Sequence, residues 1–219
     1  MNKEQKRNFF ISTILILLAV VFTILVKVVD VKAIGGNGTD IGFTSLNQLV
    51  FKITGVNMIW YHITDWLGLI PVFMAIIYAF VGLIQLIKRK SIFKVDTEII
   101  LLGVFYIIVI VLYVFFEKVI INYRPVLING FLEASYPSSH TLITICICVS
   151  SILINKRLFN NKITKVIDII SVVILVITVV GRLISGVHWF TDIIGGILIS
   201  SSLLMLFYSC IKATNRKFR

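Results

Sequence analysis

Long apolar runs separated by short polar segments dominate the pattern of this chain. A helix needs roughly 18 to 20 apolar residues to cross the hydrocarbon core of a bilayer. Six runs of the chain are candidates for such helices. The fourth and fifth give the weakest signal for a membrane span, because they are short or carry a charge such as Asp168. The six runs are residues 9–26, 67–87, 99–116, 141–154, 166–180 and 193–211. They predict an all-α integral membrane fold, a bundle of six transmembrane helices.

The first run follows a short basic start, which is also typical of a signal peptide. The run is longer than the apolar region of most signal peptides, and no small-x-small cleavage site follows it closely. We therefore interpret it as a retained membrane anchor. The whole chain, 1–219, is then expected to form a single membrane-embedded domain.

Positive charge is distributed unevenly between the segments that join the runs. Lys and Arg residues mark the cytoplasmic loops of membrane proteins. With both termini inside, most of the 21 Lys and Arg residues fall on the inner side of a six-span arrangement. The asymmetry predicts a multi-pass protein of the plasma membrane, with cytoplasmic termini and with loops 117–140 and 182–192 outside.

The composition agrees with a bilayer as the solvent. Hydrophobic residues make up 58% of the chain, charged residues 14%, and the mean hydropathy is +1.03, which excludes an ordinary soluble domain. The net charge of +11 is explained by topology and by attraction to anionic lipid. No basic and aromatic pattern indicates a nucleic-acid partner. The spacing of Cys146, Cys148 and Cys210 matches neither a zinc site nor a disulfide framework.

The outer segment between the first two runs, residues 31–66, contains a second kind of pattern. Ser45 and Gln48 have the spacing of a capping box, and apolar residues follow at helical spacing up to Gly55. This pattern predicts a short amphipathic helix at the membrane interface. The residues after it are interpreted as interfacial: an aromatic belt of Trp60, Tyr61 and Trp66, and the polar residues His62 and Asp65, which belong to no motif.

Several cationic side chains lie at the predicted outer ends of the spans, against the charge rule. A phosphate dianion accepts charge-assisted hydrogen bonds from such groups, so their convergence predicts an anion site. A single Arg or Lys near a helix end is often explained by snorkelling, but snorkelling does not account for the spacing described next. The residues concerned are Lys118, Arg124, His140, Arg182 and His188.

His188 and Asp192 are four residues apart, which places them on one face if both are helical. The carboxylate can then accept a hydrogen bond from one imidazole nitrogen and leave the other free as a nucleophile. Arg182 precedes His188 and is placed to hold phosphate oxygens. Gly186 permits the turn expected between them.

His140 follows Pro137 at the expected N-terminus of the fourth span. Backbone N–H groups at such a terminus lack intrahelical partners and favour an anion, and the hydroxyls of Ser138 and Ser139 add further donors. A histidine at this place can protonate a leaving-group oxygen as a general acid.

Together these residues form three blocks in order. The chain here resembles the type 2 phosphatidic acid phosphatase superfamily, whose pattern is Lys-x6-Arg-Pro, Pro-Ser-Gly-His and Ser-Arg-x5-His-x3-Asp. The resemblance covers residues 117–192, and the order of the spans agrees with the six-helix membrane members of that family. The matching blocks are Arg124-Pro125, Pro137-Ser138-Ser139-His140, and Gly181-Arg182 with His188 and Asp192.

The resemblance implies a phosphatase that forms a phosphohistidine at His188, with Asp192 orienting the ring and His140 as the acid. It also implies that Arg124, Arg182 and the Ser138-Ser139 segment hold the phosphoryl group. Apart from His188 and Asp192, no outside cluster of His, Asp, Glu or Cys has clear metal-ligand spacing. We therefore expect a metal-free mechanism without a cofactor.

The chain departs from the family pattern at three positions. Ser139 stands in place of the family glycine, and Gly181 in place of the serine before the arginine. The position of the family lysine is occupied by Glu117, with Lys118 one residue nearer to the arginine. Because a carboxylate would repel a phosphate dianion, we expect Lys118 to bind the phosphate, although the sequence leaves both arrangements open.

An outward site framed by span ends would receive a head group while the hydrocarbon tail stays in the bilayer, which predicts a membrane lipid phosphate as substrate. The resemblance to bacterial members suggests undecaprenyl pyrophosphate, a carrier lipid of cell-wall synthesis. Phosphatidylglycerophosphate and phosphatidic acid are the alternatives. A non-catalytic lipid-phosphate binding protein or a transporter is less favoured, because the catalytic residue types are all present and the charges gather at one interface.

Overall fold

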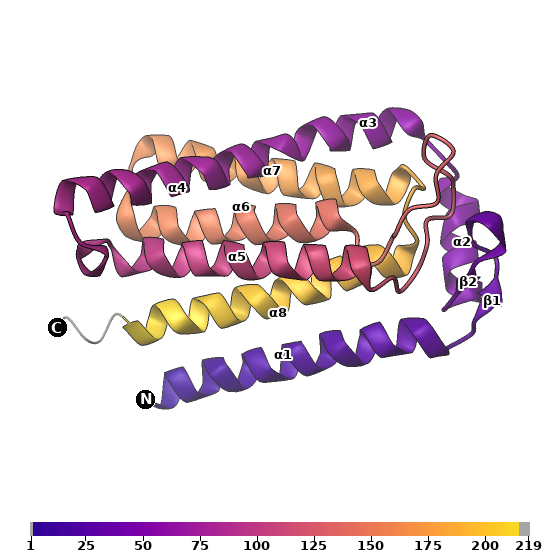
Figure 1. The fold of residues 1–219 in the computed structure, drawn as a ribbon, viewed down its shortest axis with the longest axis horizontal. Helices are drawn as coiled ribbons and strands as arrows, with labels where there is room; N and C mark the ends of the chain where they lie inside the picture. Colours follow the sequence, from indigo (N-terminus) through magenta and orange to yellow (C-terminus); the bar gives the residue numbers. More distant parts are fainter. Residues whose placement is uncertain (1, 215–219) are drawn as a thin grey trace.

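The computed structural model describes residues 2–214. Within that range, six helical segments are long and apolar enough to cross a membrane, which confirms the predicted six-helix bundle. They run parallel or antiparallel to one another along the long axis of the molecule (Figure 1). They are α1 (Lys3–Val28), α3 with α4 (Met58–Leu67 and Leu69–Arg89), α5 (Thr97–Lys118), α6 (Ser139–Leu158), α7 (Lys162–Ile184) and α8 (Phe190–Thr214).

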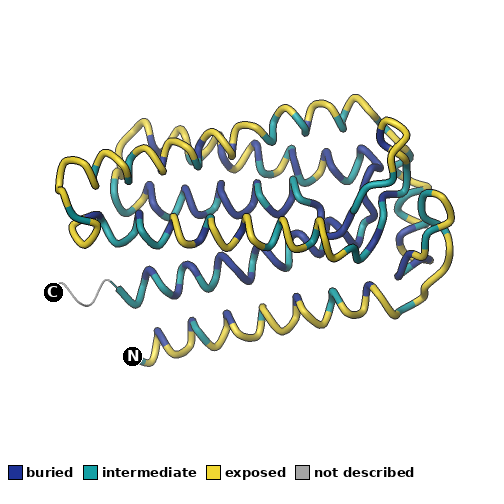
Figure 2. Tube along the Cα trace, in the orientation of Figure 1, coloured by how far each residue is buried: buried dark blue, intermediate teal, exposed yellow. Residues whose placement is uncertain are grey.

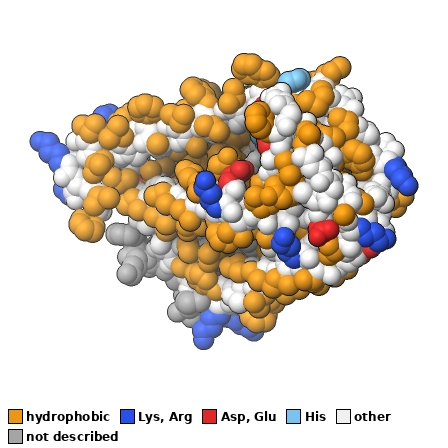
Figure 3. Space-filling view, turned by 45° about the vertical axis from the view of Figure 1, so that its right-hand side comes forward, with side chains coloured by type: hydrophobic (Ala, Val, Ile, Leu, Met, Phe, Trp, Pro, Cys, Tyr) orange, Lys and Arg blue, Asp and Glu red, His pale blue; other side chains and the backbone are white. Residues whose placement is uncertain are grey.

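Two of the helices form the centre of the bundle. α6 and α8 are largely buried, whereas α1, α4, α5 and α7 expose apolar side chains on their outer faces (Figure 2). Apolar side chains also cover much of the face seen in Figure 3, as expected for a surface in contact with lipid tails. The core joins apolar residues of α4, α5, α6 and α8, such as Leu102, Leu142 and Phe207.

The central position of α6 explains why its sequence gave a weak membrane signal. A buried helix does not have to be apolar on every side, provided that its polar groups find partners. The Tyr78 hydroxyl donates to Asn155 Oδ1 at 2.7 Å, and Asn155 Nδ2 donates to Asp168 Oδ1 at 2.8 Å. This network ties α4, α6 and α7 together and gives the Asp168 carboxylate of the fifth span a partner.

The two ends of the bundle differ. The start of α1 and the end of α8 lie at one end, together with the α4–α5 and α6–α7 connections (Figure 1). The α4–α5 connection includes the short 3-10 helix η2 (Ile92–Lys94). The longer connections lie at the opposite end. There the α1–α3 segment contains β1 (Lys32–Ala33), η1 (Gly36–Gly38), β2 (Asp40–Ile41) and α2 (Thr44–Thr54).

α2 is the predicted amphipathic helix, but the predicted capping box is wrong. The helix begins at Thr44, one residue before Ser45, so Ser45 is already inside it. Its first turn is capped from a distance, because the Asp30 carboxylate accepts a hydrogen bond from Ser45 N at 2.7 Å. That bond, with the Ser45 side chain and Lys32 adding to it, lowers the pKa of Asp30.

α2 also contacts the start of α8 instead of only lying on the membrane surface. Asn47 is fully buried, its Oδ1 accepts from Thr191 N at 3.1 Å, and its Nδ2 donates to Thr191 Oγ1 at 3.0 Å. The ring of Phe51 packs against Trp189 with centroids 5.7 Å apart. α2 therefore fixes the position at which α8 begins.

Candidate active site

Residues of all three sequence blocks meet at the end of the bundle that carries the long connections. His188 belongs to the short α7–α8 loop, between Arg182 at the end of α7 and Asp192 in the first turn of α8. Arg124 comes from the α5–α6 loop, and His140 from the first turn of α6. Ser139 and His188 line one pocket, and Asp65 Oδ1 lies 2.6 Å from Arg182 Nη2 and 3.1 Å from His140 Nε2. Besides burial, the charge of Arg124 contributes to lowering the pKa of His188.

The loop that carries His188 is held by a close backbone contact. Gly186 has φ +65°, in the left-handed region that glycine favours, as the turn predicted from the sequence requires. A Cβ at Gly186 would lie 1.8 Å from the carbonyl oxygen of Gly55, which ends α2. Only glycine fits at this contact, which holds the α7–α8 loop close to the backbone of the α2–α3 turn.

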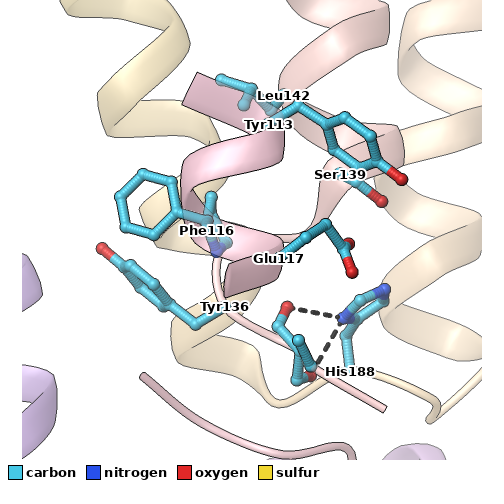
Figure 4. A pocket seen from close by; sticks show the side chains of 10 residues that line it. Tyr113, Phe116, Glu117, Tyr136, Ser139, Leu142 and His188 are labelled. Atoms are coloured by element: carbon cyan, nitrogen blue, oxygen red, sulfur yellow. Dashed lines mark hydrogen bonds between the residues drawn. The ribbon is translucent and has the colours of Figure 1, made fainter. Parts of the chain in front are cut away.

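The hydrogen bonds of His188 define its tautomer. Its Nδ1 lies 3.1 Å from the Ser135 carbonyl oxygen and 3.1 Å from Ser135 Oγ (Figure 4). A carbonyl oxygen only accepts, so Nδ1 must carry the hydrogen. Nε2 is then the unprotonated nitrogen, and it is buried without a hydrogen-bond partner in the described chain. This is the arrangement that a nucleophilic imidazole needs.

The direct bond expected between His188 and Asp192 is not formed. Nδ1 of His188 is 3.9 Å from Asp192 Oδ2, which is too long for a hydrogen bond. His188 precedes α8 and is not on it, so the helical spacing assumed from the sequence does not apply. The Ser135 hydroxyl lies between them and donates to Asp192 Oδ2, so the three side chains form a His188–Ser135–Asp192 relay.

Asp192 is fully buried and is held by several donors besides Ser135. Its Oδ2 accepts from Trp189 N at 2.9 Å, and its Oδ1 accepts from Asn122 Nδ2 at 3.3 Å. The first of these bonds also satisfies a free N–H at the start of α8. A buried carboxylate held in this way is a rigid partner for the relay.

His188 is kept neutral by its surroundings. Burial lowers the pKa of His188 well below its ordinary value, and the positive charges of Arg124 and Arg182 lower it further, as does His140. The hydrogen bond to the Ser135 backbone acts in the opposite direction. The imidazole therefore keeps its lone pair at neutral pH.

The two arginines are each fixed by one carboxylate and keep further donors unpaired. Arg182 is fully buried, and its Nη2 donates to Asp65 Oδ1 at 2.6 Å. Arg124 Nη2 lies 3.1 Å from Glu133 Oε2 across the α5–α6 loop, in which the two residues also pair through their backbones. In both arginines, Nε and Nη1 are buried and have no partner among residues 2–214. Unpaired cationic donors of this kind are suited to binding a phosphate.

His140 is the first-turn residue of α6 that the sequence predicted. Its Nε2 lies 3.1 Å from Asp65 Oδ1, and its buried Nδ1 has no partner in the described chain. The two serines before it differ in position. Ser139 lines the pocket with His188, whereas Ser138 is fully buried and its hydroxyl accepts from Thr141.

The pocket beside His188 contains Glu117, and Lys118 is not among the residues that line it. The Glu117 carboxylate at the end of α5 points to the same space as Ser139 and His188 (Figure 4). Our expectation that Lys118 serves the phosphate is therefore not supported by the geometry. Both residues lie at the end of α5 and are exposed, but only Glu117 lines the pocket.

Four residues of the site were missed or misinterpreted at the sequence level. Ser135 and Asn122 lie next to the blocks but outside the family pattern. Asp65 and Tyr61 were assigned to the interface, yet Asp65 bonds two site residues and the Tyr61 ring lies 5.1 Å from the Arg182 guanidinium. The Asp65 carboxylate could have indicated a role in the site, since an acidic residue close to a membrane span usually has a charged or polar partner.

Comparison with known proteins agrees with the blocks. The model of the PAP2 superfamily matches residues 114–216. In fold, the chain is similar to a crystal structure from Bacillus subtilis described as the first transmembrane PAP2 type phosphatidylglycerolphosphate phosphatase. The TM-score is 0.60, the sequence identity is 21%, and the match covers 95% of this chain and 98% of that chain. A comparison with curated proteins gave no match. Residues 114–216, the region that matches the PAP2 superfamily, contain all three sequence blocks.

Proposed function

We propose that the protein is a lipid phosphatase that works through a phosphohistidine at His188. One observation carries the proposal: Nε2 of His188 is buried, unprotonated and without a partner, at the place where two arginines keep buried donors unpaired. A nucleophile beside cationic hydrogen-bond donors that can bind the phosphoryl oxygens is the arrangement required for phosphoryl transfer to the protein.

The reaction follows from these positions. Nε2 of His188 attacks the terminal phosphorus, and the bond from this phosphorus to the oxygen that stays with the lipid breaks as His140 gives that oxygen a proton. That oxygen is the ester oxygen of a monophosphate or the bridging oxygen of a pyrophosphate. Arg124, Arg182, Ser139 and the free N–H groups at the start of α6 hold the phosphoryl oxygens. Water then attacks the phosphohistidine and gives its proton to His140. Inorganic phosphate leaves, and both histidines return to their starting states.

A lipid substrate is supported by the walls of the neighbouring pocket. Asp65 and His140 share that pocket with the apolar side chains of Leu69, Val72 and Ile143. A phosphate can thus reach the polar floor while its hydrocarbon tail stays against apolar helix surface. Because residues from α3 to α8 contribute to the site, we also propose that the chain acts as one domain.

Two substrates are proposed for comparison. Undecaprenyl pyrophosphate is the first, since the charge asymmetry predicts an outward site and this carrier is released on the outer side. Phosphatidylglycerophosphate is the second, and two observations support it. The similar Bacillus subtilis protein is described as acting on that lipid, and Glu117 adds negative charge to the pocket, which disfavours a pyrophosphate more than a monoester.

The test is phosphate release by detergent-purified protein from both lipids, from phosphatidic acid and from a soluble phosphomonoester. We expect a preference for lipids, no activity for His188→Ala, and full activity with a chelator present. Brief reaction of His140→Ala with labelled lipid phosphate should leave an acid-labile, base-stable phosphoprotein. Substantial turnover by His188→Ala would refute the phosphohistidine, and inhibition by chelator would refute metal independence.

The orientation is tested separately by cysteine labelling of intact cells. Asn129 and Asn160 lie in the α5–α6 and α6–α7 connections, at opposite ends of the bundle, and both have positive φ. We propose that the Asn129 end faces outside. Labelling of a cysteine at Asn160 together with protection of one at Asn129 would invert the proposed topology.

A further inference from the structure

We infer that Asp65 is a positioning residue that acts through both His140 and Arg182, and that it makes Nδ1 of His140 the atom that exchanges the proton. No block of the family pattern contains Asp65. The inference rests on the proposed phosphatase function of the same site.

A single carboxylate oxygen joins the two residues. Asp65 Oδ1 accepts from Arg182 Nη2 at 2.6 Å and lies 3.1 Å from His140 Nε2. The ionised carboxylate beside Nε2 favours a hydrogen on that nitrogen of His140. Nδ1 is then the nitrogen left for proton transfer, and it is buried without a partner in the described part of the chain.

The close packing of α3 fixes the place of this carboxylate. A Cβ at Gly181 of α7 would lie 2.5 Å from Thr64 and 3.0 Å from Trp60, so α3 approaches α7 at a distance that only glycine permits. A Cβ at Gly68, where α3 ends, would lie 2.8 Å from the His140 ring. Asp65 therefore sits on a short helix that contacts both of its partners.

The proton follows from this geometry. His140 first takes up a proton from solvent at Nδ1 and becomes the imidazolium. As the bond between phosphorus and the leaving oxygen breaks, Nδ1–H passes this proton to that oxygen. Asp65 stays ionised and keeps Nε2–H throughout. In the second half-reaction, the attacking water returns a proton to Nδ1. The simpler alternative is that Asp65 only neutralises the buried Arg182, which needs a counter-charge wherever it lies.

The leaving group separates these two roles. The leaving group of an alkyl phosphate is an alkoxide, which leaves poorly without a proton from an acid, whereas the p-nitrophenolate of p-nitrophenyl phosphate leaves without one. General acid catalysis contributes about 100-fold or more. Asp65→Asn should thus lower kcat on a lipid alkyl phosphate by about 100-fold, and on p-nitrophenyl phosphate by less than about tenfold.

Glu133→Gln is the matched control. Glu133 holds the other arginine, Arg124, at 3.1 Å, and its side chain is as exposed as that of Asp65, at 42% against 43%. It makes no ion pair with a histidine among residues 2–214. Its replacement should affect the two substrates equally and should act mainly on KM. Asp65→Glu moves the carboxylate by one methylene and should show the same dependence on the leaving group, which provides a second variant if Asp65→Asn does not fold.

An equal loss on both substrates, or no loss on either, would overturn the inference and leave Asp65 as a counter-ion of Arg182. Failure of the proposed function has a different signature, because the wild-type protein would then release no phosphate from any lipid. The wild-type lipid assay is therefore measured beside each variant.

Discussion

Replacement of Ser135 by alanine tests the relay that links the proposed nucleophile to its carboxylate. The change removes the hydroxyl that lies 3.1 Å from His188 Nδ1 and donates to Asp192, but it keeps the Ser135 carbonyl that fixes the tautomer. A hydrogen bond to a buried charged group contributes about 1.5 to 3 kcal/mol. If the relay stabilises the histidine as it gains the phosphoryl group, kcat should fall by about 10- to 100-fold.

The substrate should bind to Ser135→Ala almost as well as before, because Arg124 and Arg182 are untouched. Single-turnover kinetics on the lipid substrate would measure the phosphorylation step directly. Ser200→Ala is the matched control, since Ser200 is also fully buried but its hydroxyl bonds only to carbonyls of its own helix. If Ser135→Ala keeps activity within about twofold of wild type, the reasoning is refuted, and Asp192 acts on the reaction by another route.

Three further predictions follow from the described contacts. Gly186→Ala places a Cβ against the Gly55 carbonyl at positive φ, so we expect a lower midpoint of thermal unfolding and less folded protein. Gly130→Ala is the control, because Gly130 also has a positive φ of +81° but a Cβ there meets nothing within 4 Å. Glu117→Lys exchanges the pocket carboxylate for a cation and should strengthen inhibition by inorganic phosphate about tenfold or more. Lys118→Ala should change this inhibition little. A larger effect of Lys118→Ala than of Glu117→Lys would show that Lys118 binds the phosphate. Because burial and the neighbouring cations lower the pKa of His188, its neutral form persists below the ordinary histidine pKa. The acid limb of kcat/KM due to this group should therefore lie below about pH 6.5, and a limb above that value in the pH–rate profile would contradict the neutral nucleophile.

The hydrophobic pattern predicted the helices well because lipid-facing surfaces have to be apolar. All six runs are helical, and the weak fourth run is weak for a physical reason: α6 is enclosed by other helices and can carry polar residues such as Asn155. The helix starts were less predictable. α2 is capped by Asp30, which is distant in the sequence, and no local pattern around Ser45 reveals such a cap.

The site was predictable where chemistry is local in the sequence and unpredictable where it is not. His140, His188 and the two arginines lie in compact blocks. Ser135 and Asp65 act across the fold, and their roles depend on how α3 and the α5–α6 loop pack against α6 and α7. The assumption that His188 and Asp192 share a helical face failed because α8 begins only at Phe190.

The distant residues have a common effect on the arginines. Each guanidinium forms an ion pair with one carboxylate from outside the sequence blocks, Asp65 or Glu133, and keeps other donors unpaired. An arginine held in this way cannot turn freely, so binding a phosphoryl group requires little further ordering of the side chain. The partner carboxylate also reduces the net positive charge. Donors that are oriented in advance can stabilise the charge that develops in the transition state. For the proposed phosphatase, we expect the reduced net charge to favour release of the inorganic phosphate.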